Sequence, residues 1–161
     1  MNRVAVADTG SLHYLILIDG ADILAWLFDR ILIPAAVRDE LLNSTTPAKV
    51  KNWIVGKKNW LSIETLDNSQ AIHGLHRGEA EALQLALRSK ASLVLMDDLD
   101  GRAAARQLGL AVTGTMGLLE RAAELKMIHL PDAVAKLRQT SFFVSPELLE
   151  AALQRDKQRK P

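Results

Sequence analysis

The chain has 161 residues, which is enough for one domain with a sizeable core, and its 48% hydrophobic and 24% charged residues are typical of a soluble globular protein. It contains no cysteine, which excludes disulfides and thiolate metal sites. The net charge of +1 is too small to indicate a strongly basic nucleic-acid-binding protein.

The first half of the chain alternates short apolar runs with amphipathic segments. The expected strands are residues 3–7, 30–33 and 60–64, and the expected helices are residues 11–18, 21–28, 34–42 and 47–54. Pro34 and Pro47 open two of these helices, because proline suits the first helical position. Residues 66–76 show little periodicity and are expected to form a loop.

The second half continues this alternation. Strands are expected at residues 92–96 and 110–113, and helices at residues 79–88, 99–108, 114–126, 131–138 and 146–155. Residues 92–96 are apolar on both faces, which is typical of a parallel strand covered by helices on each side. The order of elements predicts one α/β domain over residues 1–161, a three-layer α/β/α sandwich with a five-stranded, mainly parallel sheet.

The N-terminus and the most apolar region favour a cytoplasmic protein with no membrane association. Residues 1–3 lead straight into a strand and show no signal peptide. The most apolar region, residues 14–28, is interrupted by Asp19, Gly20 and Asp22, which fits two packed helices better than a membrane span. Residues 155–161 carry four basic side chains and are expected to form a solvated tail, with phosphate contact as the alternative.

Acidic side chains follow two of the expected strands. Asp8 comes directly after the first strand, and Asp97 and Asp98 come directly after the fourth. Burying such charges is costly, so if the two strands are neighbours, the carboxylates converge at one sheet edge and need a compensating cation. Mg²⁺ and Mn²⁺ take oxygen ligands and activate water, so the pattern predicts a metal-dependent phosphodiester hydrolase.

Three further acids lie in expected helices. Glu79 and Glu81 are two residues apart, so they point to roughly opposite sides of their helix and only one is expected to enter a given cleft. Glu79 lies in the first turn, where the helix dipole already favours a negative charge, and this favours Glu81 as the metal ligand. Glu40 alone would be an ordinary solvated helix residue, and only the presence of the other acids makes it a candidate site residue.

Several polar residues near the acids are expected to support the site. Thr9 and Ser11 follow the first acid and either orient it or cap the next helix. Asp100 is a first-turn acid, and Arg102, one turn after Asp98, is placed to pair with Asp98 or to bind phosphate. Thr115 lies at a strand-to-helix junction, where backbone N–H groups hold anions.

Histidines and aromatic residues indicate no further site. No metal-ligand spacing involves the histidines, which are His13, His73, His76 and His129. The aromatic content of 4% is too sparse for a base-stacking platform.

Four segments together resemble the PIN-domain ribonucleases. They are VAVADTGSL at residues 4–12, VRDEL at 37–41, EALQLA at 81–86 and LVLMDDLD at 93–100. The GEAE, DD and TGT signatures at residues 78–81, 97–98 and 113–115 are similar to a poorly characterised prokaryotic PIN-like branch that resembles VapC-type toxins. The resemblance covers roughly residues 3–130, so the helices from residue 131 onward are less clearly matched.

The resemblance implies a sheet ordered 3-2-1-4-5 and RNA cleavage that depends on Mg²⁺ or Mn²⁺. It also implies a homodimer, and possible membership of a toxin–antitoxin pair whose antitoxin protein blocks the acidic cleft. The expected catalytic residues are Asp8, Glu40, Glu81 and Asp98. The expected metal ligands are Asp8, Glu81, Asp97 and Asp98.

Alternative functions remain at this point. A haloacid-dehalogenase-like phosphatase needs a second Asp two residues after the first, but position 10 is Gly. Dinucleotide binding is disfavoured because no Gly-x-Gly-x-x-Gly follows the first strand. A non-catalytic interaction module with the same fold stays open.

Overall fold

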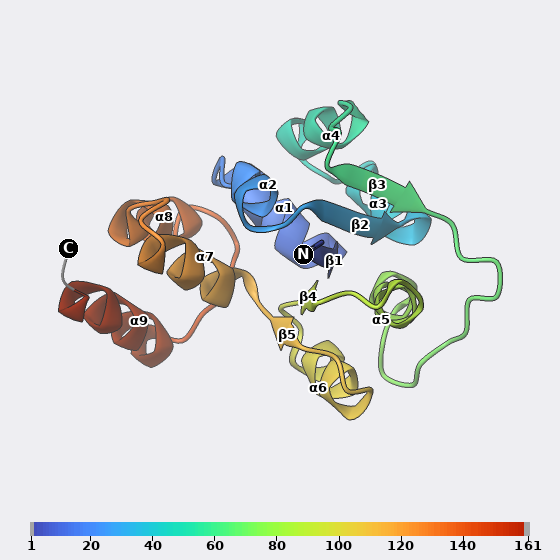
Figure 1. The fold of residues 1–161 in the computed structure, drawn as a ribbon. Helices are drawn as coiled ribbons and strands as arrows, with labels where there is room; N and C mark the ends of the chain where they lie inside the picture. Colours follow the sequence, from blue (N-terminus) through green and yellow to red (C-terminus); the bar gives the residue numbers. More distant parts are fainter. Residues whose placement is uncertain (1, 160–161) are drawn as a thin grey trace.

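A computed structural model describes residues 2–159 of the chain as a five-stranded parallel sheet covered by helices (Figure 1). The strands are β1 (Val4–Ala7), β2 (Arg30–Pro34), β3 (Leu61–Glu64), β4 (Leu93–Leu95) and β5 (Val112–Thr113). The helices are α1 (Thr9–Leu17), α2 (Asp22–Leu27), α3 (Ala35–Leu41), α4 (Ala48–Val55), α5 (Arg77–Ser89), α6 (Leu99–Gln107), α7 (Thr115–Glu124), α8 (Leu130–Leu137) and α9 (Pro146–Gln158).

The sheet order is β3-β2-β1-β4-β5, and every neighbouring pair is parallel. Strand β1 lies in the centre, where Val6 pairs with Leu32 of β2 and Val94 of β4. The predicted fold class and strand order are therefore confirmed. The central position of β1 brings its carboxyl end beside that of β4, as the hypothesis of converging acids requires.

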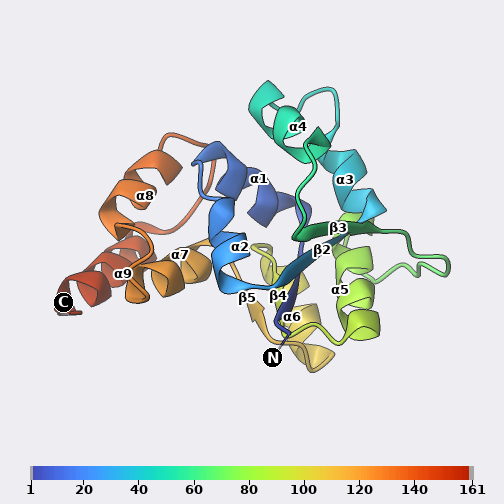
Figure 2. The same cartoon turned by 45° about the horizontal axis from the view of Figure 1, so that its top comes forward.

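The helices form one layer on each face of the sheet. Successive β1 side chains point to opposite faces, so Val6 packs in a cluster with α5 and α6, whereas Ala5 and Ala7 pack in the larger cluster on the other face. The larger cluster includes α1, α2 and α7. Figures 1 and 2 show α7, α8 and α9 packed together beside α1, at the end of the molecule away from β3.

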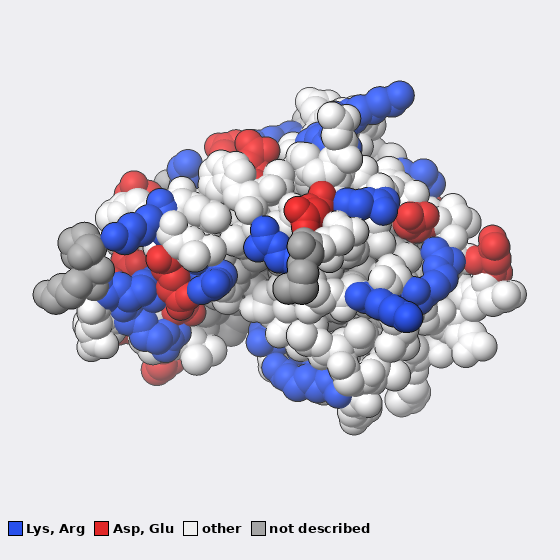
Figure 3. Space-filling view, in the orientation of Figure 1, with Lys and Arg blue, Asp and Glu red and all other residues white. Residues whose placement is uncertain are grey.

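The molecular surface carries intermixed charges. On the face shown in Figure 3, basic and acidic side chains are interspersed, as the net charge of +1 suggests. Among residues 2–159, no helix combines the length and the apolar character needed to cross a bilayer.

The C-terminal side chains Arg155 and Lys157 are exposed, as expected for a solvated tail, but they belong to a helix. Helix α9 continues to Gln158, three residues beyond its predicted end, and Arg159 pairs with Asp156 at 2.8 Å. Arg155 donates two hydrogen bonds to the Glu120 carboxylate, at 2.9 and 3.0 Å. Residues 160–161 of the expected tail lie outside the described residues.

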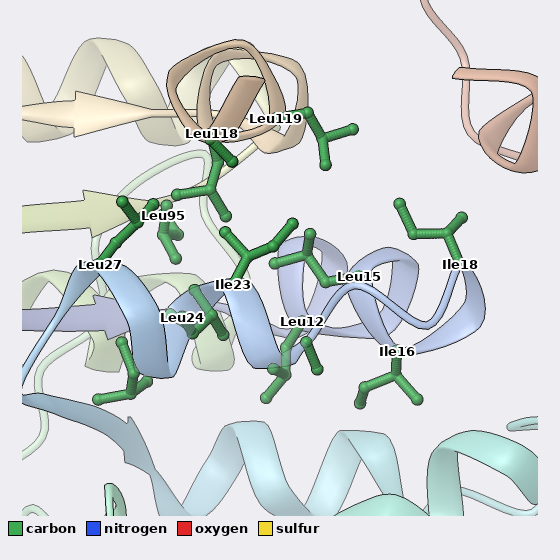
Figure 4. Packing of buried hydrophobic residues seen from close by; sticks show 14 of the residues in the cluster. Leu12, Leu15, Ile16, Ile18, Ile23, Leu24, Leu27, Leu95, Leu118 and Leu119 are labelled. Atoms are coloured by element: carbon green, nitrogen blue, oxygen red, sulfur yellow. The ribbon is translucent and has the colours of Figure 1, made fainter. Parts of the chain in front are cut away.

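The larger core joins the N-terminal helices to the C-terminal ones. Figure 4 shows Leu15 of α1 and Ile23 of α2 on the side that faces Leu118 and Leu119 of α7, whereas Leu12 of α1 points away from α7 into the same cluster. All five side chains are nearly or fully buried. Burying a leucine or isoleucine side chain contributes about 1.5–3 kcal/mol, so this packing holds α7, and the segment that follows it, firmly against α1.

Candidate active site at the carboxyl edge of the sheet

Asp8 is the innermost acid of the carboxyl edge. It directly follows β1, its backbone N–H donates to the Leu95 carbonyl of β4 at 3.1 Å, and only 4% of the residue is exposed. Its side chain caps α1, because Oδ1 accepts a hydrogen bond from the Ser11 N–H at 3.1 Å. This cap explains why α1 begins at Thr9, two residues earlier than predicted.

Asp97 follows β4, and Ser11 donates hydrogen bonds to both Asp97 and Asp8. The Ser11 hydroxyl donates to Asp97 Oδ2 at 3.3 Å, while the Ser11 N–H holds Asp8. The N–H and hydroxyl of Thr115 also donate to Asp97, at 2.6 and 2.7 Å. Gly114 makes room for this carboxylate, since a Cβ atom there would lie 2.6 Å from Asp97 Oδ1. Thr115 and Ser11 therefore orient Asp97.

Glu40 reaches the same edge from α3. Its Oε2 accepts a hydrogen bond from the Thr9 hydroxyl at 2.6 Å. Its carboxylate lies against the first turn of α5, where a Cβ atom at Gly78 would collide with Glu40 Oε1. Thr9 and the absence of a side chain at Gly78 therefore fix this carboxylate.

Glu79 enters the edge from the first turn of α5 and is only 5% exposed. The His76 N–H donates to its Oε1 at 3.4 Å, and His76 Nε2 lies 3.3 Å from the same oxygen. His76 Nδ1 is 3.8 Å from Glu40 Oε1, so the ring bridges the two glutamates. Burial raises the pKa of Glu79, and the charges of Asp98 and Glu40 raise it further, whereas His76 lowers it.

Glu81 does not join these acids, although it was the favoured ligand of the pair. Its side chain is buried with only 2% of the residue exposed, and its Oε2 accepts hydrogen bonds from Arg77 Nε at 2.7 Å and from the Ser69 hydroxyl at 3.0 Å. The two glutamates do point to different surroundings, as their spacing predicts. The geometry favours Glu79 over Glu81 as the acid of the cleft.

The remaining predicted residues lie at the start of α6 or near it. Asp98 is exposed and caps α6, because its Oδ2 accepts the Gly101 N–H at 2.9 Å. Asp100 is an exposed first-turn acid. Arg102 lies beside Gly114, where a Cβ atom would be 3.0 Å from its Nη1. Sequence reasoning missed His76, whose position directly before the first residue of α5 places its side chain near the acids of the first helical turn.

Asp8 carries the strongest electrostatic perturbation of the site. Burial raises its pKa from 3.8 to about 7, and the negative charges of Asp97 and Glu79 add to the rise, while hydrogen bonds from Ser11 oppose it. We call Asp8, Glu40, Glu79, Asp97 and Asp98 the acidic cluster. Among residues 2–159, no lysine or arginine forms an ion pair with a member of this cluster.

The acidic cluster fits a hard divalent cation by the chemistry of its donors. Carboxylate oxygens are the ligands that Mg²⁺ and Mn²⁺ prefer, and a cation would offset the burial and the repulsion that together raise the pKa of Asp8. In the described part of the chain, no three Asp, Glu or His side chains are already grouped around one metal position. The acids are instead held by their own hydrogen-bond donors, which are Ser11, Thr9, Thr115 and the Gly101 N–H.

Comparisons with known proteins agree with the fold and the motifs. The chain is similar to a solved PilT N-terminus domain protein from the hyperthermophilic archaeon Sulfolobus solfataricus P2, with 19% identity over 78% of this chain and 97% of that chain and a TM-score of 0.56. At this identity, the likeness concerns the fold alone. A comparison with curated proteins found no match.

A family model, DUF3368, described as a PIN domain, matches residues 4–158. PIN domains are generally nucleases and typically bind divalent metal ions. The match extends well past residue 130, so it also includes the C-terminal helices that the motifs left less clearly assigned. Because the family model spans nearly the whole chain, the chain belongs to the PIN-domain family.

Proposed function

We propose that this chain is an endoribonuclease that depends on Mg²⁺ or Mn²⁺ and uses the acidic cluster to hold the ion. The observation that carries the proposal is Asp8, a nearly buried carboxyl group whose pKa is raised to about 7 beside Glu79 and Asp97. A fold rarely keeps buried acids together without a compensating charge, because each of them is costly to ionise there. A divalent cation supplies that charge.

Asp8, Glu79 and Asp97 are the residues that would hold the ion, with Glu40 and Asp98 at the margins of the site. This assignment replaces Glu81, which is already paired with Arg77. When bound, such an ion lowers the pKa of a coordinated water and stabilises the charge on the phosphate oxygens during phosphodiester cleavage.

The side chains around the cluster keep the carboxylates in place. Ser11 donates to both Asp8 and Asp97, so one residue sets the separation of the two acids. Thr115 holds Asp97 from the other side, and Thr9 holds Glu40. These contacts keep the acids oriented before substrate arrives, which lowers the reorganisation needed for catalysis.

A cleavage assay with labelled single-stranded RNA tests this function directly. We expect cleavage in Mn²⁺ or Mg²⁺, none in EDTA, and a loss of roughly 100-fold or more in kcat/KM for Asp8→Asn and Asp97→Asn. Asp39→Asn is the matched control, because Asp39 is an exposed acid next to Glu40 that lies outside the cluster. Equal activity of the wild type and Asp8→Asn, or activity in EDTA, would refute the metal-nuclease assignment.

The toxin role, the antitoxin partner, the homodimer and the cytoplasmic location rest on the sequence, chiefly on the family resemblance. Co-purification with the product of a short neighbouring reading frame would support an antitoxin. Size-exclusion chromatography with light scattering tests the homodimer. If the wild type cleaves no RNA in any of these metal ions yet binds such a partner, the non-catalytic alternative takes the place of the nuclease.

A further inference from the structure

A groove leads away from the acidic cluster toward α9. It has a volume of about 590 Å³ and begins at Asp97 and Asp98. It is also lined by Arg102 of α6, by the β5–α7 junction at Gly114, and by residues 142–145 and α9. We call it the Phe143 groove. Its lining includes residues 142–145 and α9, which the proposed chemistry does not use.

We propose that the Phe143 groove binds one nucleotide of a single-stranded RNA substrate next to the cleavage site, with the base on Phe143 and the phosphate at Arg102. The inference rests on the proposed ribonuclease function and deepens it. It assigns a substrate-positioning role to two residues outside the acidic cluster.

Phe143 is an apolar ring held in solvent by an ordered backbone. It is 85% exposed, while the adjacent Phe142 packs edge-on against Tyr14 with ring centroids 5.0 Å apart. The Tyr14 hydroxyl lies 2.9 Å from the Ser141 hydroxyl, and the Phe142 N–H donates to the Thr140 hydroxyl at 3.1 Å. These contacts anchor the segment to α1, so Phe143 is presented outward at little further entropic cost on binding.

An exposed aromatic ring in a groove suits a nucleobase. Every base has a π-face, and stacking on an aromatic side chain tolerates different sequences. The low aromatic content of the chain argued against a stacking platform, but a single base needs only one ring in the right place. Leu99 and Leu148, which are 78% and 66% exposed, add apolar surface along the same groove.

Arg102 lies where the groove meets the acidic cluster. A Cβ atom at Gly114 would be 3.0 Å from Arg102 Nη1 and 2.6 Å from Asp97 Oδ1, so the guanidinium and the carboxylate both border this glycine. Arg102 Nε is buried and has no hydrogen-bond partner among the described residues. The Arg102 guanidinium also forms no ion pair among the described residues, and a phosphate oxygen in the groove is a matching acceptor for its terminal N–H groups.

The second arginine of the groove is not free in the same way. Arg155 is held by two hydrogen bonds to the Glu120 carboxylate. The groove therefore offers one uncommitted guanidinium, at the end that adjoins the acids. A phosphate there and a base on Phe143 place the strand along the groove and its next phosphodiester toward the acidic cluster. Because the groove combines an apolar ring with an uncommitted guanidinium, it fits a nucleotide better than an apolar protein segment.

RNA binding by the full chain tests the stacking contact without relying on cleavage. The probe is a short fluorescein-labelled 2′-O-methyl RNA oligonucleotide, which resists hydrolysis, and the readout is fluorescence anisotropy. We expect Phe143→Ala to weaken binding roughly 5- to 100-fold and Phe143→Trp to retain it, as stacking requires. Trp26→Ala, which removes a half-exposed aromatic of α2 from a different cavity, should leave binding unchanged.

The phosphate contact is tested by the salt dependence of the same binding reaction. For Arg102→Gln, we expect the slope of log K against log salt to become shallower by roughly 0.7, the value for one phosphate of a single strand. Arg106→Gln is the control, since Arg106 is exposed one turn further along α6 and does not line the groove. Equal slopes for Arg102→Gln and the wild type would overturn the assignment of Arg102.

The groove proposal and the nuclease proposal fail separately. If the wild type cleaves RNA and Phe143→Ala binds and cleaves like the wild type, the groove proposal is overturned and the nuclease stands. If the wild type binds RNA through Phe143 but never cleaves it, the nuclease fails and the groove stands. Failure of the wild type to bind RNA, or loss only of self-association in Phe143→Ala, would also overturn the groove proposal. Phe143 is exposed, so an unchanged melting temperature confirms that the variant is folded.

Discussion

Glu79 and Glu81 are two residues apart in α5 and are almost equally buried, with 5% and 2% of each residue exposed, yet their surroundings are opposite. The Glu81 carboxylate accepts hydrogen bonds from the Arg77 guanidinium and the Ser69 hydroxyl. Glu79 lies among other acids, and among residues 2–159 the exposed imidazole of His76 is the one basic group within salt-bridge distance of it. Burial alone therefore does not distinguish the two glutamates, and the proposed site rests on the difference in charge compensation between them.

The largest expected effect concerns the cost of ionising the acidic cluster without metal. The folded-state pKa of Asp8, about 7, lies above its ordinary value of 3.8, so the penalty is absent below about pH 4 and is complete above pH 7. At about 1.4 kcal/mol per pH unit, this span corresponds to about 4 kcal/mol. In EDTA, the free energy of unfolding of the wild type should fall between pH 5 and pH 8, and that of Asp8→Asn should fall much less.

Urea unfolding at the two pH values measures this difference. The raised pKa of Glu79 acts in the same direction, so a smaller slope should persist in Asp8→Asn. Saturating Mn²⁺ should restore much of the lost stability of the wild type at pH 8, because a ligand that binds the folded state stabilises it. Identical pH dependence in the two proteins would show that Asp8 is not perturbed.

Glu81, the glutamate of α5 that has a basic partner, should instead stabilise the protein through its ion pair. Arg77→Met leaves the buried Glu81 carboxylate with the Ser69 hydroxyl alone, which should lower the free energy of unfolding by about 1–3 kcal/mol. Arg88→Met, at an exposed position in the last turn of the same helix, should change stability by less than about 0.5 kcal/mol. Equal stability of the two variants would mean that Glu81 does not need its partner.

A glycine substitution tests whether Glu40 contributes to the function of the acidic cluster. Gly78→Ala places a Cβ atom against the Glu40 carboxylate and should displace it, lowering kcat/KM for RNA roughly 10-fold. Gly10→Ala is the matched control, because no atom lies within 4 Å of the added Cβ there. If Gly78→Ala cleaves RNA as well as Gly10→Ala, Glu40 has no role in the site.

The smallest effect separates capping from ligation at Asp98. Asp98→Ala removes the cap of α6 and should cost about 1 kcal/mol in thermal unfolding, whereas Asn also caps and should cost only a few tenths. Because Asp98 is exposed and already accepts the Gly101 N–H, Asp98→Asn should reduce RNA cleavage less than Asp97→Asn does. The reverse order would make Asp98 the principal ligand of the pair.

Local patterns were sufficient to predict the sheet and most helices. The alternation of apolar runs and helical segments predicted all five strands, and Pro34, Pro47 and Pro146 mark where α3, α4 and α9 begin. The strand order came from the resemblance of four motifs to PIN domains and is confirmed. Strand β5 is shorter than expected, since only Val112 and Thr113 pair with β4.

The choice between Glu79 and Glu81 could not be made from local patterns. The helix dipole accounts equally well for a first-turn acid in a cleft and for one on the surface. What distinguishes the two glutamates is tertiary: Ser69 approaches Glu81 from a loop without periodicity, and α3 brings Glu40 toward Glu79. The exposure of Phe143 has the same origin, because it depends on Phe142 packing against α1.

Mn²⁺ binding to the wild type, Glu79→Gln and Glu81→Gln, measured by isothermal titration calorimetry, tests the central claim most directly. Both substitutions remove one buried carboxylate from α5 at nearly equal exposure. If the ion binds at the uncompensated acids, the wild type should bind Mn²⁺, Glu79→Gln should bind it roughly 10-fold or more weakly, and Glu81→Gln should match the wild type. Weakened binding in Glu81→Gln together with wild-type binding in Glu79→Gln would contradict the account.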